Sequence, residues 1–444
     1  MKTPPLTTQS VALLLLLPLL AIPPTSGAQA LPAAVASPIS TGFSLPSSAG
    51  TLQYALSSSE SISNNNFGSS GTNYNSNLNG DLAFISSSPR APFSMVFSGG
   101  RSWSTSSQSY NFLNLAFSQV VNAGRWNFML SDSVCYLPQT ASAGLSGVAG
   151  VGDLGLSPVQ PGAIPGQGVL TGYSTRVANS SSLSLGRQIT GKTSFNASGS
   201  YSLTRFLSNS VSSTVPSSPG LNTDGYSVSA SLSHTIDTRN SFAGNFAYSR
   251  NTYSGASYGI RQPSFSGQTA SLQYSHQFTR KFGMSLAAGP QWTSIDSPGL
   301  TPTLSLFANL SASYAGKFSH ATIAYSRSSN SGFGVVGGAI SNSVTFSTGR
   351  TFDRVWFCAL TSAYTQTANL PSAASLPFTF HTTIAGVQVS RALARSLSAY
   401  ASYTLQNQSN QGTAAAVDLF SGLSNIAGFG ITFSPSAVRL GGHS

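Results

Sequence analysis

The sequence contains few charged residues. Only 7% of its 444 residues are Asp, Glu, Lys or Arg, whereas a soluble domain usually has about 25%. A chain of this length would form about three soluble domains, and it has too few charges to cover their surfaces. The low charge content therefore argues against a soluble multidomain enzyme.

Long apolar runs are also absent after the N-terminus. Beyond residue 30 the chain offers no run of apolar residues long enough for a membrane-spanning helix, which needs about 18 or more. Only helices and closed barrels satisfy every backbone polar group in lipid. A membrane-embedded form of this chain must therefore be a closed β-barrel.

Serine, glycine and aromatic residues are abundant instead. Aromatic residues make up 10% of the chain, which is too many for a disordered protein. Serine accounts for about one residue in five. A composition that is neither charged nor strongly apolar is typical of a transmembrane β-barrel, which has one face in lipid and the other in water.

The first 30 residues have the features of a secretory signal peptide. Lys2 precedes the apolar run 11–17, and Ala28 and Ala30 form a small-x-small cleavage site, so we predict cleavage after Ala30. A signal anchor is the alternative, but prolines interrupt a run that is too short to span a bilayer. The Pro/Ser-rich segment 31–50 that follows is too short to plug a barrel. We expect export to the bacterial outer membrane.

Alternation of apolar and polar residues identifies the strands. From Tyr226 to Ile236, apolar side chains such as Val228 and Leu232 occupy one parity and serines occupy the other. This is the pattern of a strand with one apolar and one polar face.

The two-strand unit recurs along the second half of the chain. Tight turns centred on Arg239, Arg280, Gly316, Phe352 and Leu393 are spaced 36 to 41 residues apart. A propeller blade has a similar period, but it contains four short strands. Here each period contains two strands of about ten or more residues, the length of a membrane-spanning strand. Tight turns alternate with longer Ser/Gly/Asn/Pro loops, a pattern that favours an outer-membrane barrel over a propeller or a sandwich.

We predict an all-β fold, a transmembrane antiparallel up-and-down barrel of about 18 strands over residues 51–433, with short periplasmic turns and long external loops. Sixteen strands remain an alternative, because the first six are less regular. The expected strands are 51–61, 78–86, 93–103, 111–121, 125–135, 173–187, 192–206, 225–236, 240–253, 267–278, 281–292, 303–315, 317–328, 341–350, 354–366, 379–390, 394–406 and 424–433.

The pattern resembles a bacterial outer-membrane porin from about residue 51 to residue 433. The resemblance rests on strand length, alternation and turn asymmetry. In porins the third external loop commonly folds into the barrel and narrows the channel. The resemblance implies this role for residues 136–171, the longest loop of this chain, and an outward cap over the mouth is the alternative.

The last predicted strand is similar to the final strand that outer-membrane proteins present to the assembly machinery. Phe429, Ile431 and Phe433 occupy one parity. Family members typically end on the aromatic residue itself, whereas a C-terminal tail, residues 434–444, follows here.

Most basic residues lie at or beside the short turns, where we expect them to contact water and anionic lipid headgroups. The net charge of +11 would also suit a nucleic-acid-binding protein, but a rim of cations at one end of a barrel favours lipid over nucleic acid. The rim consists of Arg90, Arg125, Arg187, Lys192, Arg239, Arg280, Lys281, Lys317, Arg350, Arg354, Arg391 and Arg395. The predicted periplasmic aromatic girdle consists of Phe242, Phe278, Phe282, Phe318, Phe352 and Trp356.

A second charged set lies toward the other strand ends. If these arginines point inward, they would face acidic residues across a constriction and favour anions. The alternative is that they are solvated loop residues. The candidate pore constriction consists of Asp132, Asp153, Arg101, Arg176, Arg205, Arg250 and Arg327.

Catalytic, cofactor and metal sites are not indicated. His234, His276 and His320 lie near the short turns and not at the lumen or external mouth, where a barrel hydrolase needs them. Cys135 and Cys358 fall on distant strands, too far apart for a disulfide. Metal-ligand spacings, phosphate loops and dinucleotide fingerprints are missing from the sequence. We therefore predict that the protein is not an enzyme and has no cofactor.

The sequence favours a passive channel for small hydrophilic solutes, which would diffuse through a lumen lined by Ser, Thr, Asn and Gln. A barrel of 16 to 18 strands leaves an aqueous channel. The alternative is a non-transporting structural or adhesive barrel whose external loops bind a partner. The expected partners are the solutes, outer-membrane lipid and the assembly machinery, and the porin resemblance implies a homotrimer.

Overall fold

The computed structural model describes residues 50–66, 69–86, 88, 91–105, 109–139, 174–207, 222–254, 256–257, 260–261, 263–297, 301–330, 338–353, 355–370, 378–412 and 422–440. The predicted signal peptide, Arg90, Asp153 and Arg354 lie outside these residues, as does loop 136–171 beyond Gln139. No helix in these ranges is long and apolar enough to cross a membrane.

The described residues form long antiparallel strands joined in chain order. The barrel strands are β1 (Gly50–Asn66), β2 (Ser69–Ser86), β3 (Phe93–Ser104), β4 (Tyr110–Ala123), β5 (Trp126–Gln139), β6 (Ser174–Gln188), β7 (Thr193–Leu207), β8 (Asn222–Thr235), β9 (Asn240–Ser254), β12 (Phe265–Thr279), β13 (Phe282–Ile295), β14 (Thr303–Ala315), β15 (Ser319–Asn330), β16 (Ala339–Phe352), β17 (Trp356–Asn369), β18 (Phe378–Ala392), β19 (Leu397–Gly412) and β20 (Gly422–Phe433). A small separate hairpin, β10 (Ala256–Ser257) and β11 (Ile260–Arg261), lies between β9 and β12.

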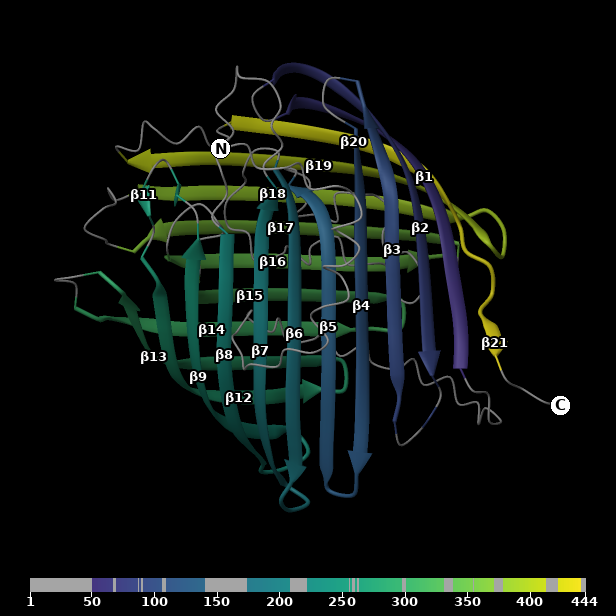
Figure 1. Ribbon diagram of the computed structural model, residues 1–444. Coiled ribbons are helices and arrows are strands. Elements are labelled where there is room, and N and C mark those ends of the chain that lie inside the picture. Colours follow the sequence, from purple (N-terminus) through teal and green to yellow (C-terminus); the bar gives the residue numbers. More distant parts are fainter. Residues whose placement is uncertain are drawn as a thin grey trace, which may run out of the picture.

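The sheet closes on itself. Each barrel strand pairs with the next, β9 pairs directly with β12, and the first and last strands pair with Leu56 opposite Phe433. Figure 1 shows β1 to β9, purple to teal, as one wall and β12 to β20, green to yellow, as the other. The predicted fold, an antiparallel up-and-down barrel of eighteen strands, is confirmed, and the sixteen-strand alternative is wrong.

The residues after β20 add a short strand that the sequence does not predict. β21 (Val438–Leu440) pairs with Gly50–Leu52, at the start of β1. β20 covers β1 only from Leu56 onward, so β21 supplies hydrogen-bond partners for an edge that would otherwise be open.

Several strands extend beyond their predicted ends on the side of the long loops. β1 continues to Asn66, β2 begins at Ser69, and β19 continues to Gly412. The added residues are mostly Ser, Asn, Gln and Gly on both parities. Alternation is absent there, because neither face of such a segment needs to be apolar. We call this end of the barrel the long-loop end and the other the short-turn end.

The two faces of the barrel wall differ in polarity as the alternation predicts. Leu272, Leu304 and Phe429 are 75%, 64% and 62% exposed and share one face, whereas the intervening residues are mostly small and polar. Directly paired residues lie on the same side of a sheet, so the strand register carries this assignment around the whole barrel. The exposed apolar face is the outer one and the polar face lines the lumen.

Candidate functional site

The lumen wall is lined by pairs of hydroxyl groups. The Oγ atoms of Ser198 and Ser229, directly opposite each other on β7 and β8, are 2.6 Å apart. The same contact joins Ser285 to Ser311 at 2.7 Å, and four further inward pairs are Ser131–Ser182, Ser194–Ser233, Ser326–Ser343 and Ser341–Thr367. Short hydroxyls bond to each other across the strands, so the wall is polar and uncharged where these pairs lie.

The lumen wall also has amide side chains near the place where β1 and β20 pair and close the barrel. The inward positions of β1 include Ser57, Ser59 and Ser63, and those of β2 include Asn73, Asn75, Asn77 and Asn79. On β19 the inward residues Gln406 and Gln408 are 0% and 1% exposed, and Thr382 donates to the Oε1 atom of Gln408 at 3.0 Å. Amides and hydroxyls both donate and accept hydrogen bonds, so they can bond to one another across this part of the wall.

Few charges point inward. Among the described side chains of the eighteen barrel strands, the Asp, Glu, Lys and Arg residues on the lumen face are Asp81 on β2 and Arg176 on β6. Asp81 lies opposite Ala55 and Ser98, and all three are buried. Arg176 lies opposite Leu137 and Phe206.

Most candidate constriction residues lie on the outer face. Arg205 is opposite Val177 on β6 and binds Asp224 through two contacts of 2.8 and 2.7 Å. Arg250 binds Asp296 at 2.9 Å. The outer set consists of Asp132, Arg101, Arg205, Arg250 and Arg327. Arg176 alone of the described candidates faces the lumen, and Asp153 lies outside the described residues. Alternation weakens near strand ends, so the sequence could not fix the parities of the arginines.

Asp132 is an acidic residue on the outer face, in the middle of β5. Its Oδ1 atom accepts hydrogen bonds from Nδ2 of Asn179, at 3.0 Å, and from the hydroxyl of Ser181, both on β6. It shares its face with Leu130 and Val134. A carboxylate beside apolar side chains requires such donors.

The predicted girdle residues lie at one end of the barrel. All six are exposed and lie at or within a few residues of short turns. Some of these rings pack against each other: Phe278 and Phe282 have ring centroids 5.3 Å apart. Others make cation–π contacts: the guanidinium of Arg391 lies 5.1 Å from the ring of Trp356.

A second set of aromatic residues, which the sequence reasoning missed, lies on the outer face toward the long-loop end. The hydroxyl of Tyr403 donates to Asn425 at 2.7 Å, and that of Tyr201 donates to Asp224 at 3.0 Å. The set consists of Tyr74, Trp103, Tyr201, Tyr226, Tyr248, Trp292, Tyr325, Tyr364 and Tyr403. Each of these residues occupies the same parity as the apolar residues of its strand, and this pattern in the sequence could have identified them. Two aromatic belts flanking an apolar band are typical of a membrane-spanning barrel.

Two histidines contact polar side chains of neighbouring strands, and the two cysteines are free. Nδ1 of His276 lies 2.7 Å from Oδ1 of Asn240, and Nδ1 of His234 lies 2.9 Å from the hydroxyl of Thr193. Cys135 and Cys358 are free thiols on β5 and β17. In the part of the chain that the structure describes, no group of three or more His, Cys, Asp or Glu could hold a metal ion.

Comparisons with known proteins give distant structural likenesses. No protein-family model and no curated protein sequence matches the chain. Pseudomonas aeruginosa OpdQ is 8% identical, with a TM-score of 0.42, and the match covers 87% of this chain and 98% of OpdQ. P. aeruginosa OpdK, solved with vanillate, is 9% identical, with a TM-score of 0.42 and coverage of 86% and 98%. The siderophore receptor PirA of P. aeruginosa is 9% identical, with a TM-score of 0.41 and coverage of 88% and 81%. Function therefore has to be argued from the residues of this chain.

Proposed function

We propose that the protein is an outer-membrane channel through which small hydrophilic solutes diffuse passively. The observation that carries the proposal is a closed barrel of eighteen strands with an apolar outer face and a lumen wall of hydroxyls and amides. Barrels of this strand number leave an aqueous channel. On this proposal the protein performs no catalysis and needs no cofactor.

The proposal includes a location and an orientation. The two aromatic belts define the membrane band, with the short turns toward the periplasm and the long loops outside. A cleaved signal peptide, residues 1–30, would deliver the chain, and the outer-membrane assembly machinery would insert it. N-terminal sequencing of the exported protein tests the cleavage site, and native mass spectrometry tests the homotrimer that the porin resemblance implies.

The lumen wall supports weak charge selectivity. Arg176 and Asp81 carry opposite charges, and the hydroxyl pairs carry none. We propose that size selects the solutes more than charge does, with the loop from residue 136 to residue 171 narrowing the channel. Swelling of liposomes that contain the barrel tests this: small neutral sugars should enter faster than larger ones, and absence of swelling with every sugar contradicts a channel.

A non-transporting scaffold is the second candidate. Gln406, Gln408 and Asn73 on the lumen wall are at most 1% exposed, so this part of the wall does not face open water. A lumen filled along its whole length would favour a structural or adhesive barrel whose external loops bind a partner. The swelling experiment separates the two functions.

A further inference from the structure

The two ends of the barrel differ in how their cations are paired. Toward the long-loop end, Arg205 and Arg250 form the ion pairs found among the described residues, with Asp224 and Asp296. At the short-turn end, the described carboxylates are Asp237 and Asp353. Ten of the cations whose side chains the structure describes are exposed at that end: Arg125, Arg187, Lys192, Arg239, Arg280, Lys281, Lys317, Arg350, Arg391 and Arg395. The short-turn end therefore carries a strong positive charge that its own carboxylates do not neutralise.

Aromatic rings hold some of these cations at the level of the girdle. Arg187 lies 4.7 Å from the ring of Trp126, and Lys317 lies 4.9 Å from that of Phe318. Arg350 lies 4.9 Å from the ring of Phe352. A cation over an aromatic face is attracted to the ring electrons, so these charges stay beside the barrel wall instead of extending into bulk water.

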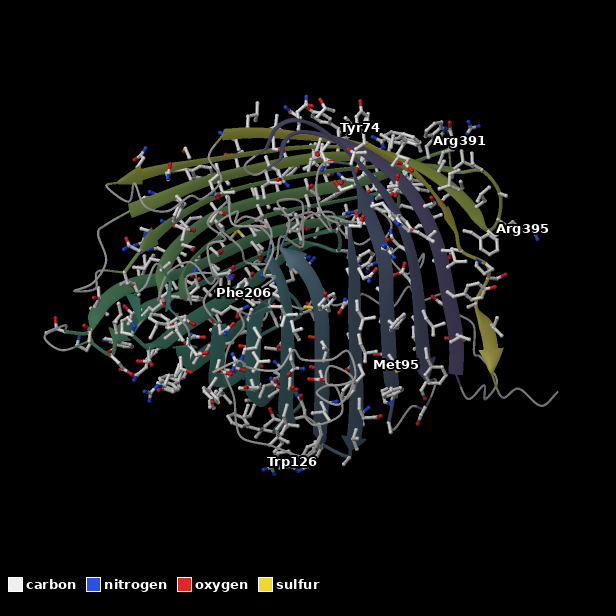
Figure 2. The ribbon with its side chains drawn as sticks, turned by 45° about the horizontal axis from the view of Figure 1, so that its top comes forward. Tyr74, Met95, Trp126, Phe206, Arg391 and Arg395 are labelled. Carbon is white, nitrogen blue, oxygen red and sulfur yellow. The ribbon has the colours of Figure 1, made fainter. Side chains whose placement is uncertain are left out.

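Two such pairs adjoin on three neighbouring strands. Phe352 on β16 is opposite Trp356 on β17, and Trp356 is opposite Arg391 on β18. Arg350 and Arg391 therefore flank two adjacent rings, and we call these four residues the arginine–ring site. Figure 2 shows Arg391 together with Arg395, from the adjoining turn, at the rim of the barrel.

Apolar surface continues from the arginine–ring site along the barrel wall. Leu360 and Val387 lie opposite each other on the same outer face and are 43% and 37% exposed. The cations and rings thus lie beside one another next to the short turn, and aliphatic side chains follow along the wall. A zone of cations and rings beside an aliphatic zone matches the headgroup and acyl regions of a phospholipid leaflet.

We propose that the arginine–ring site binds the headgroup of an anionic phospholipid, with the guanidinium groups of Arg350 and Arg391 on its phosphate. Guanidinium groups form paired hydrogen bonds with phosphate oxygens, and a net negative headgroup complements the excess of cations. The proposal rests on the membrane location proposed above and not on channel activity.

A soluble polyanion fits the same surface less well. It would neutralise the cations but leave Phe352, Trp356 and Leu360 in contact with water, whereas a lipid covers them with its glycerol and acyl groups. We therefore commit to lipid, and soluble polyanion binding is an outcome that the experiment distinguishes.

The test is lipid retention by the purified full-length barrel in micelles that contain equal amounts of phosphatidylglycerol and phosphatidylcholine, measured by native mass spectrometry. The variant carries Arg350→Gln and Arg391→Gln. The matched control is Arg101→Gln, because Arg101 lies 5.5 Å from the ring of Trp103 on the outer face near the long-loop end. Wild type and control should retain phosphatidylglycerol preferentially. The double variant should retain about thirtyfold less of it, since each of the two basic residues near an anionic surface contributes a factor of about five.

Three results would overturn the proposal. The first is that wild type retains both lipids equally. The second is that the control loses as much phosphatidylglycerol as the double variant. The third is that the double variant loses binding of soluble polyphosphate while its lipid retention stays unchanged. If the double variant lacks the circular dichroism of a β-sheet, the single variant Arg391→Gln replaces it, with a smaller loss of phosphatidylglycerol expected. Conductance is measured on the same samples, so loss of lipid binding with an intact channel separates this proposal from the proposed function.

Discussion

At the scale of single residues, the parity of a position decides whether its side chain meets the lumen or the outside. Arg176 and Arg205 lie toward the long-loop ends of adjacent strands, yet the first points inward and the second pairs with Asp224 on the outer face. Charge type alone could not separate them. The hydrogen bonds around each charge follow from the face it occupies.

Asp132 should stabilise the outer face through its neighbours. In Asp132→Ala, Asn179 and Ser181 lose the carboxylate that accepts their hydrogen bonds, so we expect the free energy of unfolding to fall by about 1–3 kcal/mol. Asp132→Asn keeps an acceptor oxygen and should lose less. Urea unfolding of the refolded barrel measures both variants, and equal stability of wild type and Asp132→Ala contradicts this role.

The turn between β8 and β9 should respond to acid through Asp237. The Asn240 side chain and the Arg239 amide donate hydrogen bonds that lower the pKa of this carboxyl group. The unfolded chain thus binds the proton more readily than the folded one. The contribution of Asp237 to stability is complete above the ordinary aspartate pKa, and it is lost as the pH falls through the lowered pKa of the folded state.

Carbon-13 NMR of the Asp237 carboxyl group measures this titration. Removal of the amide donor in Asn240→Ala should raise the pKa of Asp237 toward its ordinary value. An identical titration curve in wild type and variant shows that the Asn240 contact has no part in the shift.

At the scale of strands, the sequence predicted each element of the barrel because one face must be apolar and the other polar. The strand over Tyr226 to Ile236 shows the pattern clearly, and the structure has β8 there. The pattern fails where a strand extends past the apolar band. Asn64 and Asn66 lie on a segment of β1 that is polar on both parities, so neither the end of β1 nor the outward position of Arg101 on β3 could be read from alternation.

The short strand β21 could not be predicted from the alternation of apolar and polar residues. Its register against Gly50–Leu52 follows from the place where β20 stops, which is a property of the closed barrel. A chain truncated after Ser434 should therefore show faster hydrogen exchange within Gly50–Leu52, while the amides opposite β20, from Leu56 to Asn64, keep their protection. Unchanged exchange at the start of β1 is incompatible with this pairing.

At the scale of the whole molecule, the barrel has a lumen wall with few charges and a rim with many cations. Ion selectivity should depend on inward charges and not on outward ones. Arg176→Gln should shift the reversal potential of a bilayer under a salt gradient toward cation selectivity. The matched outer-face variant, Arg205→Gln, should leave the reversal potential where it is in the wild type. A shift of equal size in both variants contradicts the assignment of faces.

The central claim is that the lumen conducts. Single-channel recording of the purified, folded protein in planar bilayers tests it most directly. The eighteen-strand barrel with its hydroxyl-lined wall predicts discrete, ohmic current steps in salt solution on each insertion. Insertion of folded barrels with no measurable conductance would contradict a channel and leave the structural or adhesive barrel as the function.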